Sequence, residues 1–387
     1  MMDEPKQIAS TQPALEVKNL RLVFNTYAGV VKALDGIDLT VYKREVLGLV
    51  GESGCGKSVT ALAIAGLLPE NAKILSGEVL LNGQDLLKKS KKEIRLARLK
   101  DIALVFQDPM TYLNPVITIG SQITEIFTGN LAMYSEELIQ SRIEEIQSRL
   151  AGDGFSVPSF GSQSLVSLEQ ERDRLVALKN SGKKLSRGEG KRLARLRAIH
   201  YLRLVRLPEP ERIFKMYPFE LSGGMRQRAM IAMALVRRPK VLLADEITTA
   251  LDVTVQAQIL KLLKELRDKI DASIILITHD LGIVAETCDR VAVMYAGNIV
   301  EVASVFEMFK NPLHPYTKGL FAAVPKPDVS TKELESIKGS VPNLIYPPTG
   351  CRFHPRCPMA FERCPVVKPP LIEVSPGHRV ACLLYGG

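Results

Sequence analysis

Residues 51–58 read GESGCGKS, and this spacing of glycines, lysine and serine constrains the fold more than any other part of the chain. The apolar run EVLGLVG leads into it, and SVTALAIAGLL, which has helical spacing, follows it. The pattern predicts a buried strand, a glycine-rich turn and a helix. Such a turn lets successive backbone N–H groups converge on phosphate oxygens at the positive end of the helix dipole. The sequence therefore predicts a nucleotide-binding loop.

Two side chains of this loop have expected roles. Lys57 is expected to neutralise the β and γ phosphates, and Ser58 to hold Mg²⁺. A glycine-rich turn with an incidental lysine is the alternative, and the flanking strand and helix argue against it. The residues expected to bind the nucleotide here are Gly51, Ser53, Gly54, Cys55, Gly56, Lys57, Ser58 and Val59.

A second apolar run, VLLADE at 241–246, ends in two carboxylates. Asp245, at the end of the predicted strand, can reach Mg²⁺ through water. Glu246 can accept a proton from a water molecule that attacks a phosphate. A surface acidic pair at the end of a strand is the alternative, and the phosphate-binding loop elsewhere in the chain argues against it.

A second candidate phosphate-binding loop lies upstream of these carboxylates, where residues 221–228 read LSGGMRQR. Ser222, Gly223 and Gly224 open a predicted helix and could bind an anion. One chain with two such loops, and one nucleotide for each lysine-containing loop, suggests that the second loop contacts the nucleotide of another subunit. A Ser-Gly-Gly loop alone is common, so its weight comes from its order and spacing among the other motifs.

The order of these motifs resembles that of ATP-binding cassette (ABC) ATPases. Gln107, after the strand-like IALVF, resembles the family's Q-loop glutamine, which is implied to contact Mg²⁺ and the attacking water and to sense the transmembrane partner. Residues 249–252, TALD, resemble the D-loop, so Asp252 is implied to act towards the partner's nucleotide. His279 resembles the switch histidine that contacts the γ-phosphate.

Two positions fit the family's pattern less well. Phe24, or Tyr27 if the loop is shifted, resembles the aromatic residue that stacks on adenine. Ile247 stands where the family usually has proline after the catalytic glutamate. Because this position lies outside the catalytic groups, we expect no loss of activity from it.

Within the superfamily, the chain resembles the ATPase subunits of oligopeptide/dipeptide (peptide/opine/nickel) importers. The passages that carry the resemblance are GESGCGKSVT, FQDPMTYLNP, DEITTALDVTVQAQIL, NPLHPYTKGL and the stretch from GCRFHPRCPMAFERCP to VACLL. It covers roughly residues 14–150 and 200–387. It implies ATP-driven import of peptides, with nickel chelates or oligosaccharides as alternative cargo.

The same resemblance implies ATP and Mg²⁺ as ligands and a set of partner proteins. These partners are two transmembrane permeases, an extracytoplasmic substrate-binding protein and a second ATPase, often a non-identical homologue. The chain would then act as a peripheral protein at the cytoplasmic face of the cell membrane, without direct contact with nucleic acid.

The fold class that we predict is α/β, because strand-like and helix-like stretches alternate over most of the length. The resemblance implies a P-loop cassette with a RecA-like core, an antiparallel β subdomain and a helical subdomain. We expect a polar tail at 1–13, the cassette at 14–325 and a cysteine-rich extension at 326–387. The helical subdomain is expected at about 108–240, with an atypical basic insertion at about 150–200.

The insertion carries ten Lys and Arg against five Asp and Glu, more than half of the chain's net charge of +9. We expect two helices around Ser181 and Gly182, with Ser186 and Glu189 forming a capping box at the second. A solvated helical hairpin is favoured over a nucleic-acid surface, because charge runs usually face solvent and the charged part of the insertion, residues 168–200, contains no Phe, Tyr or Trp for stacking. A soluble ATPase that acts on nucleic acid is further disfavoured, because the chain has one cassette and no sustained heptad repeats between its motif halves. A regulator with a vestigial cassette is disfavoured, because every catalytic residue type is present.

Four of the six cysteines fall in the last 37 positions with the spacing C-x5-C-x6-C-x17-C. Thiolates in this number serve either an Fe–S cluster or Zn²⁺, although structural zinc prefers tighter pairs. The family resemblance implies a [4Fe–4S] cluster in some members, and we favour it over zinc, and either over free thiols. The expected ligands are Cys351, Cys357, Cys364 and Cys382, whereas Cys55 and Cys288 are expected to be packing residues.

The composition, 46% hydrophobic and 24% charged, is that of an ordinary globular protein and excludes disorder over most of the length. No stretch approaches the roughly 18 consecutive apolar residues of a membrane helix. The first residues lack the order of a signal peptide, so we expect a cytosolic protein.

Overall fold

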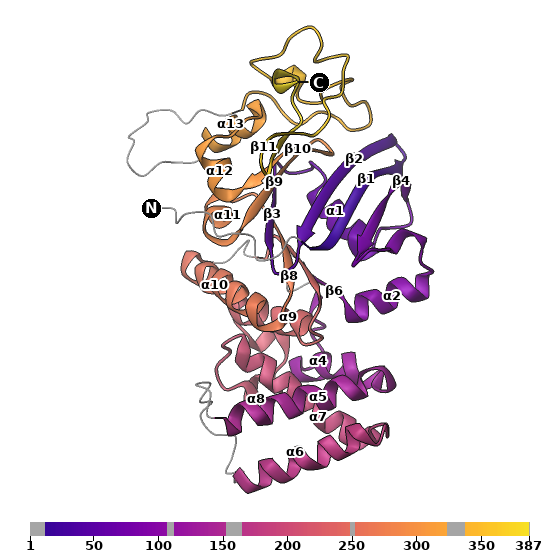
Figure 1. Ribbon diagram of the computed structural model, residues 1–387, viewed down its shortest axis with the longest axis vertical. Coiled ribbons are helices and arrows are strands. Elements are labelled where there is room, and N and C mark those ends of the chain that lie inside the picture. The colour runs from indigo at the N-terminus through magenta and orange to yellow at the C-terminus, as the bar shows by residue number, and fades with distance from the viewer. Residues whose placement is uncertain (1–11, 107–111, 152–164, 248–251, 323–336, 387) are drawn as a thin grey trace. The chain divides into compact units, whose positions relative to one another are not determined.

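The computed structural model describes residues 12–106, 112–151, 165–247, 252–322 and 337–386 (Figure 1). Contacts divide the chain into two compact units, residues 1–107 with 237–387, and residues 108–236. Each unit has its own layers and core, and each is described by itself below.

An eight-stranded sheet forms the centre of the first unit, in the order β11-β12-β10-β9-β3-β8-β7-β6. Its strands are β3 (Val46–Val50), β6 (Ile102–Val105), β7 (Val241–Asp245), β8 (Ser273–Thr278), β9 (Arg290–Tyr295), β10 (Asn298–Ser304), β11 (Ile372–Ser375) and β12 (His378–Val380). The five strands from β9 to β6 are parallel. Every residue of β3 and β8 is buried, as expected for apolar strands covered on both faces. The buried strand predicted before the glycine-rich turn is therefore confirmed as β3.

A second sheet of this unit is antiparallel and has the order β2-β1-β4-β5. Its strands are β1 (Pro13–Thr26), β2 (Gly29–Tyr42), β4 (Ala72–Leu81) and β5 (Gln84–Asp85). The Asn82-Gly83 pair, a strong hairpin signal in the sequence, forms the two-residue turn between β4 and β5 with φ values of 48° and 78°. Apolar residues of this sheet join the central sheet in one core.

The described helices of the first unit are α1 (Lys57–Ala65), α2 (Lys91–Lys100), α10 (Val253–Ile270), α11 (Leu281–Thr287), α12 (Val305–Lys310) and α13 (Pro315–Ala322). Four of them, α2, α10, α11 and α12, begin at a side-chain cap. Helix α1 is shorter than its apolar spacing suggests, because Gly66 adopts the left-handed conformation and ends it. No helix in the described part of the chain combines the length and the apolar character needed to cross a membrane.

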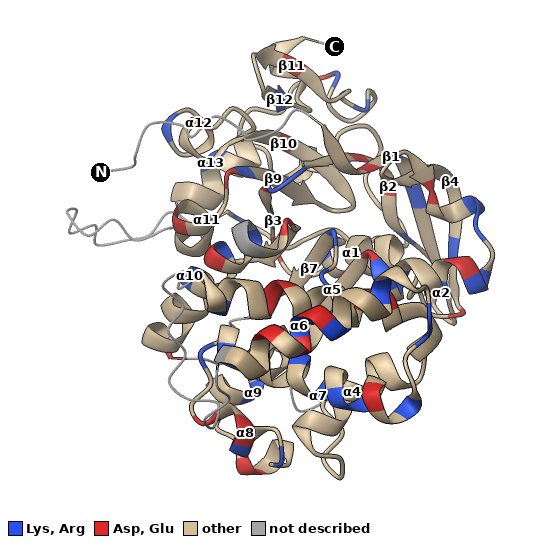
Figure 2. Cartoon of the chain, turned by 60° about the horizontal axis from the view of Figure 1, so that its bottom comes forward, with Lys and Arg blue, Asp and Glu red and all other residues tan. Residues whose placement is uncertain are grey.

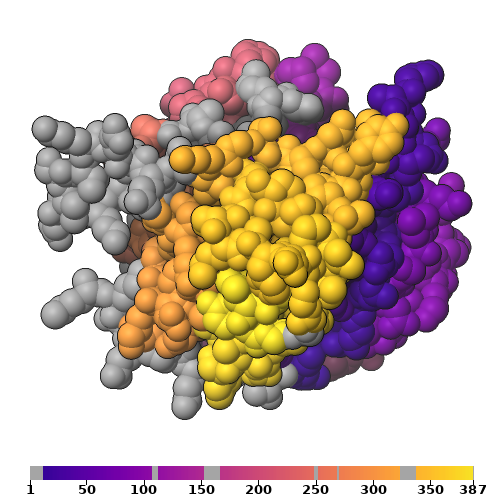
Figure 3. Space-filling view, turned by 90° about the horizontal axis from the view of Figure 1, so that it is seen from above, coloured from indigo at the N-terminus to yellow at the C-terminus, as the bar shows by residue number. Residues whose placement is uncertain are grey.

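Residues 337–386 form an extension that is built onto the central sheet. Strand β12 pairs antiparallel with β10, and β11 pairs with β12, so the extension supplies the edge of the sheet. Phe353 is fully buried against Tyr295 and Tyr316. Figure 3 shows the extension, in yellow, covering this end of the unit. A segment with little regular structure is thus held by strand pairing and aromatic packing.

The second unit is helical, as its sequence predicts. Its helices are α4 (Ile119–Thr128), α5 (Leu131–Leu150), α6 (Leu165–Asn180), α7 (Arg187–Leu204), α8 (Pro210–Ile213) and α9 (Gly223–Leu235). The core lies where α7 packs on α4, α5 and α9. Phe127 of α4 and Tyr134 of α5 are fully buried there, with their rings edge to face.

Helices α6 and α7 lie where the basic insertion is predicted, and both carry charges of both signs (Figure 2). The expectation of a solvated hairpin is wrong for α7, because Leu193, Ala194 and Ala198 of this helix are buried in the core of the unit. Ser186 caps α7 by accepting a hydrogen bond from the Glu189 N–H. The Glu189 carboxylate pairs with Arg174 across the hairpin instead of completing the predicted capping box. Glu171 of α6 pairs with Arg142 of α5 and Arg192 of α7, at 2.8 and 2.9 Å. Part of the insertion's charge therefore holds its helices together.

Candidate nucleotide-binding site

The loop between β3 and α1 has the backbone that the glycine motif predicts. Gly51, Gly54 and Gly56 have φ values of 153°, 78° and 109°, which side-chain-bearing residues rarely adopt. A Cβ atom on Gly51 would lie 2.1 Å from the carbonyl oxygen of Met294 on the neighbouring strand β9. The tight turn therefore depends on glycine for steric reasons as well as for its conformation.

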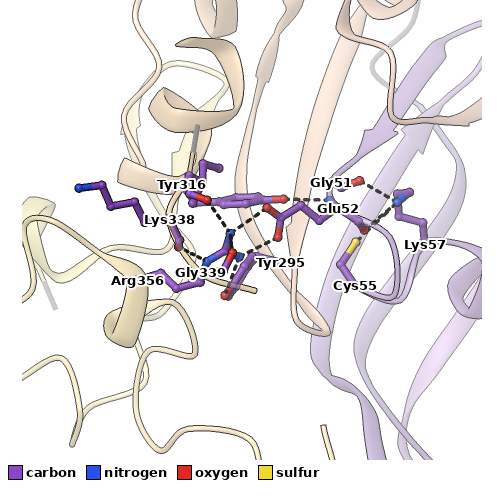
Figure 4. Close-up of polar contacts among 10 residues, drawn as sticks. Gly51, Glu52, Cys55, Lys57, Tyr295, Tyr316, Lys338, Gly339 and Arg356 are labelled. Carbon is purple, nitrogen blue, oxygen red and sulfur yellow. Dashed lines mark hydrogen bonds and ion pairs between the residues drawn. The ribbon is translucent and has the colours of Figure 1, made fainter. Parts of the chain in front are cut away.

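Lys57 is buried at the start of α1 and points back into this loop (Figure 4). Its amine donates to the carbonyl oxygens of Gly51 and Glu52 at 2.8 and 3.0 Å. Its Nζ lies 3.9 Å from the sulfur of Cys55, whose thiol pKa is raised by burial. The lysine is thus held where phosphate oxygens could replace the loop carbonyls as its partners.

Asp245 ends β7 beside Ser58, whose side chain hydrogen-bonds to the carboxylate. Burial raises the pKa of the Asp245 carboxyl, and the charge of Glu246 adds to the rise, whereas Ser58 and Lys57 oppose it. The Oδ1 atom of Asp245 is buried and finds no hydrogen-bond partner among the described residues. A buried, unsatisfied carboxylate oxygen next to a serine hydroxyl fits the oxygen ligands that Mg²⁺ prefers.

Glu246 and His279 follow the ends of adjacent parallel strands, β7 and β8. The Oε1 atom of Glu246 lies 3.3 Å from Nδ1 of His279. Glu246 has a φ of 47°, and its N–H donates to the carbonyl of Ile277 on β8. This turn at the end of β7 brings the carboxylate towards the histidine, so the pair could act together on one proton or one phosphate oxygen.

The sheet order explains why these groups meet. The glycine-rich loop follows β3, His279 follows β8, and Asp245 ends β7, and these three strands are neighbours in the parallel sheet. The carboxyl ends of parallel strands share one edge, which is where ligands bind in open α/β sheets. Residues far apart in the chain therefore form one site.

Several predicted residues lie elsewhere or outside the description. Gln107 and residues 249–251 lie outside the described residues, whereas Asp252 caps α10 by accepting from the Val255 N–H at 2.9 Å. Phe24 is half-buried on β1 and packs against the core, and Tyr27 is fully exposed just beyond that strand. Both aromatic candidates for adenine stacking thus remain predictions.

In the second unit, Ser222 caps α9 and is exposed, with its Oγ accepting from the Met225 N–H at 3.3 Å. Gly223 and Gly224 form the first turn of that helix. The loop therefore has the exposed helix start expected of a second anion-binding loop.

The four C-terminal cysteines are all free thiols. Burial raises the pKa of Cys351 to about 11, and Cys382, Cys364 and Cys357 add to the rise. Within residues 337–386 and the other described ranges, no three His, Cys, Asp or Glu side chains form a group that could hold a metal ion. The predicted cysteine metal centre is therefore not supported by the geometry. Cys55 is buried, as predicted for a packing residue, and Cys288 is half-buried.

The family model described as "ABC transporter" matches residues 34–249, so the chain belongs to the ABC transporter family. A second description, "Oligopeptide/dipeptide transporter, C-terminal region", matches residues 300–364. The protein is thus an ABC-type ATPase, and the family resemblance of its motifs is confirmed.

Among its relatives is "Dipeptide transport ATP-binding protein DppD" of Bacillus subtilis, 42% identical over 96% of this chain and 95% of that protein. "Oligopeptide transport ATP-binding protein OppD" of Salmonella typhimurium is also 42% identical, over 96% of this chain and 94% of that protein. The solved structure titled "Structure of cbiO1 from clostridium perfringens: Part of the ABC transporter complex cbiONQ" matches with a TM-score of 0.53 and 26% identity, covering 78% of this chain and 92% of that one. The predicted P-loop cassette fold is confirmed.

Proposed function

We propose that this chain is the ATP-hydrolysing subunit that powers peptide import through a membrane ABC transporter. The observation that carries the proposal is the meeting of the Lys57 loop, Asp245, Glu246 and His279 at the ends of three neighbouring strands. The match to the oligopeptide/dipeptide C-terminal region and the peptide-transport names of the relatives support peptides as cargo. Nickel chelates and oligosaccharides are the alternative cargo.

Each residue of the site has a task in hydrolysis. The loop amides and Lys57 bind the phosphates of ATP, and Lys57 leaves the carbonyls of Gly51 and Glu52 to do so. Ser58 and Asp245, with Gln107, would hold Mg²⁺, which supplies positive charge against the phosphate oxygens. Glu246 accepts the proton of the attacking water, and His279 contacts the γ-phosphate.

A transport cycle then requires two cassettes. Each ATP lies between the Lys57 loop of one subunit and the loop formed by Ser222, Gly223 and Gly224 of the other, with Asp252 at the same interface. Closure of the dimer switches two permeases, and hydrolysis reopens it. The remaining partners are an extracytoplasmic substrate-binding protein and a second, non-identical ATPase. The chain would work as a peripheral protein at the cytoplasmic face of the membrane.

The substitution Glu246→Gln tests the motor. It removes the proton acceptor and keeps the shape of the side chain, so we expect hydrolysis to fall about 10²- to 10⁴-fold while ATP-bound dimers accumulate on gel filtration. Glu136→Gln, at an exposed position of α5, is the matched control and should hydrolyse ATP as the wild type does. Near wild-type turnover of Glu246→Gln would refute the role of Glu246.

Cargo is tested separately by uptake of a labelled dipeptide into vesicles that hold this chain with its permeases and binding protein. ATP-dependent uptake of the dipeptide is expected. Uptake of a nickel chelate or an oligosaccharide instead would replace peptide as the cargo. Co-purification with ribosomes or DNA instead of membrane proteins would overturn the transport assignment itself.

We further propose that Cys351, Cys357, Cys364 and Cys382 bind a [4Fe–4S] cluster, with Zn²⁺ as the alternative, after the thiols draw closer together. Support comes from their number and spacing. Such a group would staple a segment with little core of its own. An iron and sulfide assay on anaerobically purified protein tests this, and finding neither would refute the cluster.

A further inference from the structure

Glu52, the second residue of the phosphate-binding loop, is held by an arginine from the C-terminal extension (Figure 4). Nη1 of Arg356 donates to Oε2 of Glu52 at 2.7 Å, and Nη2 donates to Oε1 at 3.0 Å. The pair is bidentate, and the arginine side chain is only 7% exposed. Two parallel bonds between a guanidinium and a carboxylate fix orientation as well as distance.

The guanidinium is fixed on its other sides as well. Nε of Arg356 donates to the carbonyl oxygen of Lys338 at 2.9 Å, and Nη2 donates to that of Gly339 at 3.1 Å. Nη1 also donates to the Tyr295 hydroxyl at 3.3 Å. Because these acceptors belong to the extension and to β9, Arg356 cannot follow Glu52 if the loop shifts.

Tyr316 of α13 makes a second contact with Glu52. Its hydroxyl accepts a hydrogen bond from the Glu52 backbone N–H at 2.9 Å. The tyrosine is fully buried and packs against Tyr295 and Phe353. Its position is therefore set by the aromatic cluster under the extension.

Glu52 in turn contacts the lysine of the site, since its carbonyl oxygen accepts from Nζ of Lys57 at 3.0 Å. Glu52 thus contacts Arg356 of the extension through its side chain, Tyr316 of α13 through its N–H, and Lys57 through its C=O. Arg356 and Lys57 lie on opposite sides of Glu52 in Figure 4.

We propose that Arg356 is a positioning residue that holds the nucleotide-binding loop in its binding conformation through Glu52. This inference rests on the proposed function and names how the extension acts on its ATP site. A loop that is ordered before ATP arrives loses less conformational entropy on binding, so the arginine raises ATP affinity without touching ATP.

The test compares Arg356→Gln with Lys338→Gln in the full-length chain. Lys338→Gln is the matched control, because it removes a neighbouring positive charge but keeps the backbone carbonyl of residue 338 that accepts from Arg356. We expect Arg356→Gln to raise the Kd for a fluorescent ATP analogue by about tenfold and to raise KM similarly, with kcat nearly unchanged. Arg356→Lys, which keeps the charge and loses the two-pronged geometry, should lie between the wild type and Arg356→Gln.

A double-mutant cycle with Glu52→Gln shows whether the arginine acts through Glu52. We expect Arg356→Gln to add little to the Kd once Glu52 is glutamine. Additive effects, or equal Kd values for Arg356→Gln and Lys338→Gln, would overturn the inference. So would a loss of kcat at unchanged KM. If Arg356→Gln fails to fold, Arg356→Lys and Glu52→Gln decide. A wild-type chain that binds no ATP would refute the proposed function, whereas binding unaffected by Arg356→Gln refutes this inference alone.

Discussion

His314 should make the stability of the first unit sensitive to mild acid. It is buried where α13 begins, and its Nδ1 accepts a hydrogen bond from the Tyr316 N–H at 3.0 Å. The Glu301 carboxylate of β10 accepts from the backbone N–H of His314 at 2.8 Å and pairs with Nε2 of His378 at 2.8 Å. Burial lowers the pKa of His314 to about 4, although the Glu301 charge opposes the shift.

The size of the effect follows from the two protonation equilibria. The unfolded chain takes up a proton at His314 near pH 6.5, whereas the folded chain does so near pH 4. Neutral His314 therefore contributes its full share to the free energy of unfolding above pH 6.5. As the pH falls from 6.5 towards 4, the unfolded chain is stabilised by protonation and the folded chain is not, so this share is lost. It amounts to about 3 kcal/mol in total and about 2 kcal/mol between pH 7 and pH 5.

Urea unfolding at pH 7 and pH 5 measures this loss. The chain has no tryptophan, so tyrosine fluorescence, to which the buried Tyr295 and Tyr316 contribute, reports unfolding. His314→Asn keeps an acceptor near the position of Nδ1 and cannot titrate, so between pH 7 and pH 5 it should lose about 2 kcal/mol less than the wild type. His354→Asn controls for the loss of any one histidine. Equal pH dependence of the wild type and His314→Asn would refute the reasoning.

Two further predictions concern the ATP site. Asp245→Asn should weaken Mg²⁺ binding, measured by titration in the presence of ATP, by about ten- to a hundredfold. It should leave the midpoint of thermal unfolding unchanged or raised, because Asp245 is a buried carboxylate with an unsatisfied oxygen. A lowered midpoint with intact Mg²⁺ binding would contradict this. Gly51→Ala should abolish ATP binding and cost about 1–3 kcal/mol of stability, because its Cβ would lie 2.1 Å from the Met294 oxygen. Gly83→Ala, with φ of 78° and open space around its Cβ, is the matched control, and equal losses in both variants would contradict the steric argument.

Local patterns were enough to predict much of this fold. The apolar runs that became β3 and most of β7 indicated strands, and the Asn82-Gly83 pair is a strong signal for a hairpin turn. The glycine spacing at 51–58 predicted the loop, because its φ values are dictated within a few residues of chain. Such features depend on neighbours in sequence, so they can be derived without the tertiary structure.

Contacts between distant parts of the chain could not be predicted in this way. The sequence alone established a phosphate-binding loop, two carboxylates and a histidine at strand ends, because residue type and spacing determine those features. Only the tertiary structure showed that β8 lies between β3 and β7, which brings Glu246 within 3.3 Å of His279. Only the tertiary structure placed Arg356 on Glu52, 304 residues away in sequence. The pairing of strands and the packing of the extension create these contacts, and no local pattern encodes which distant residue will arrive.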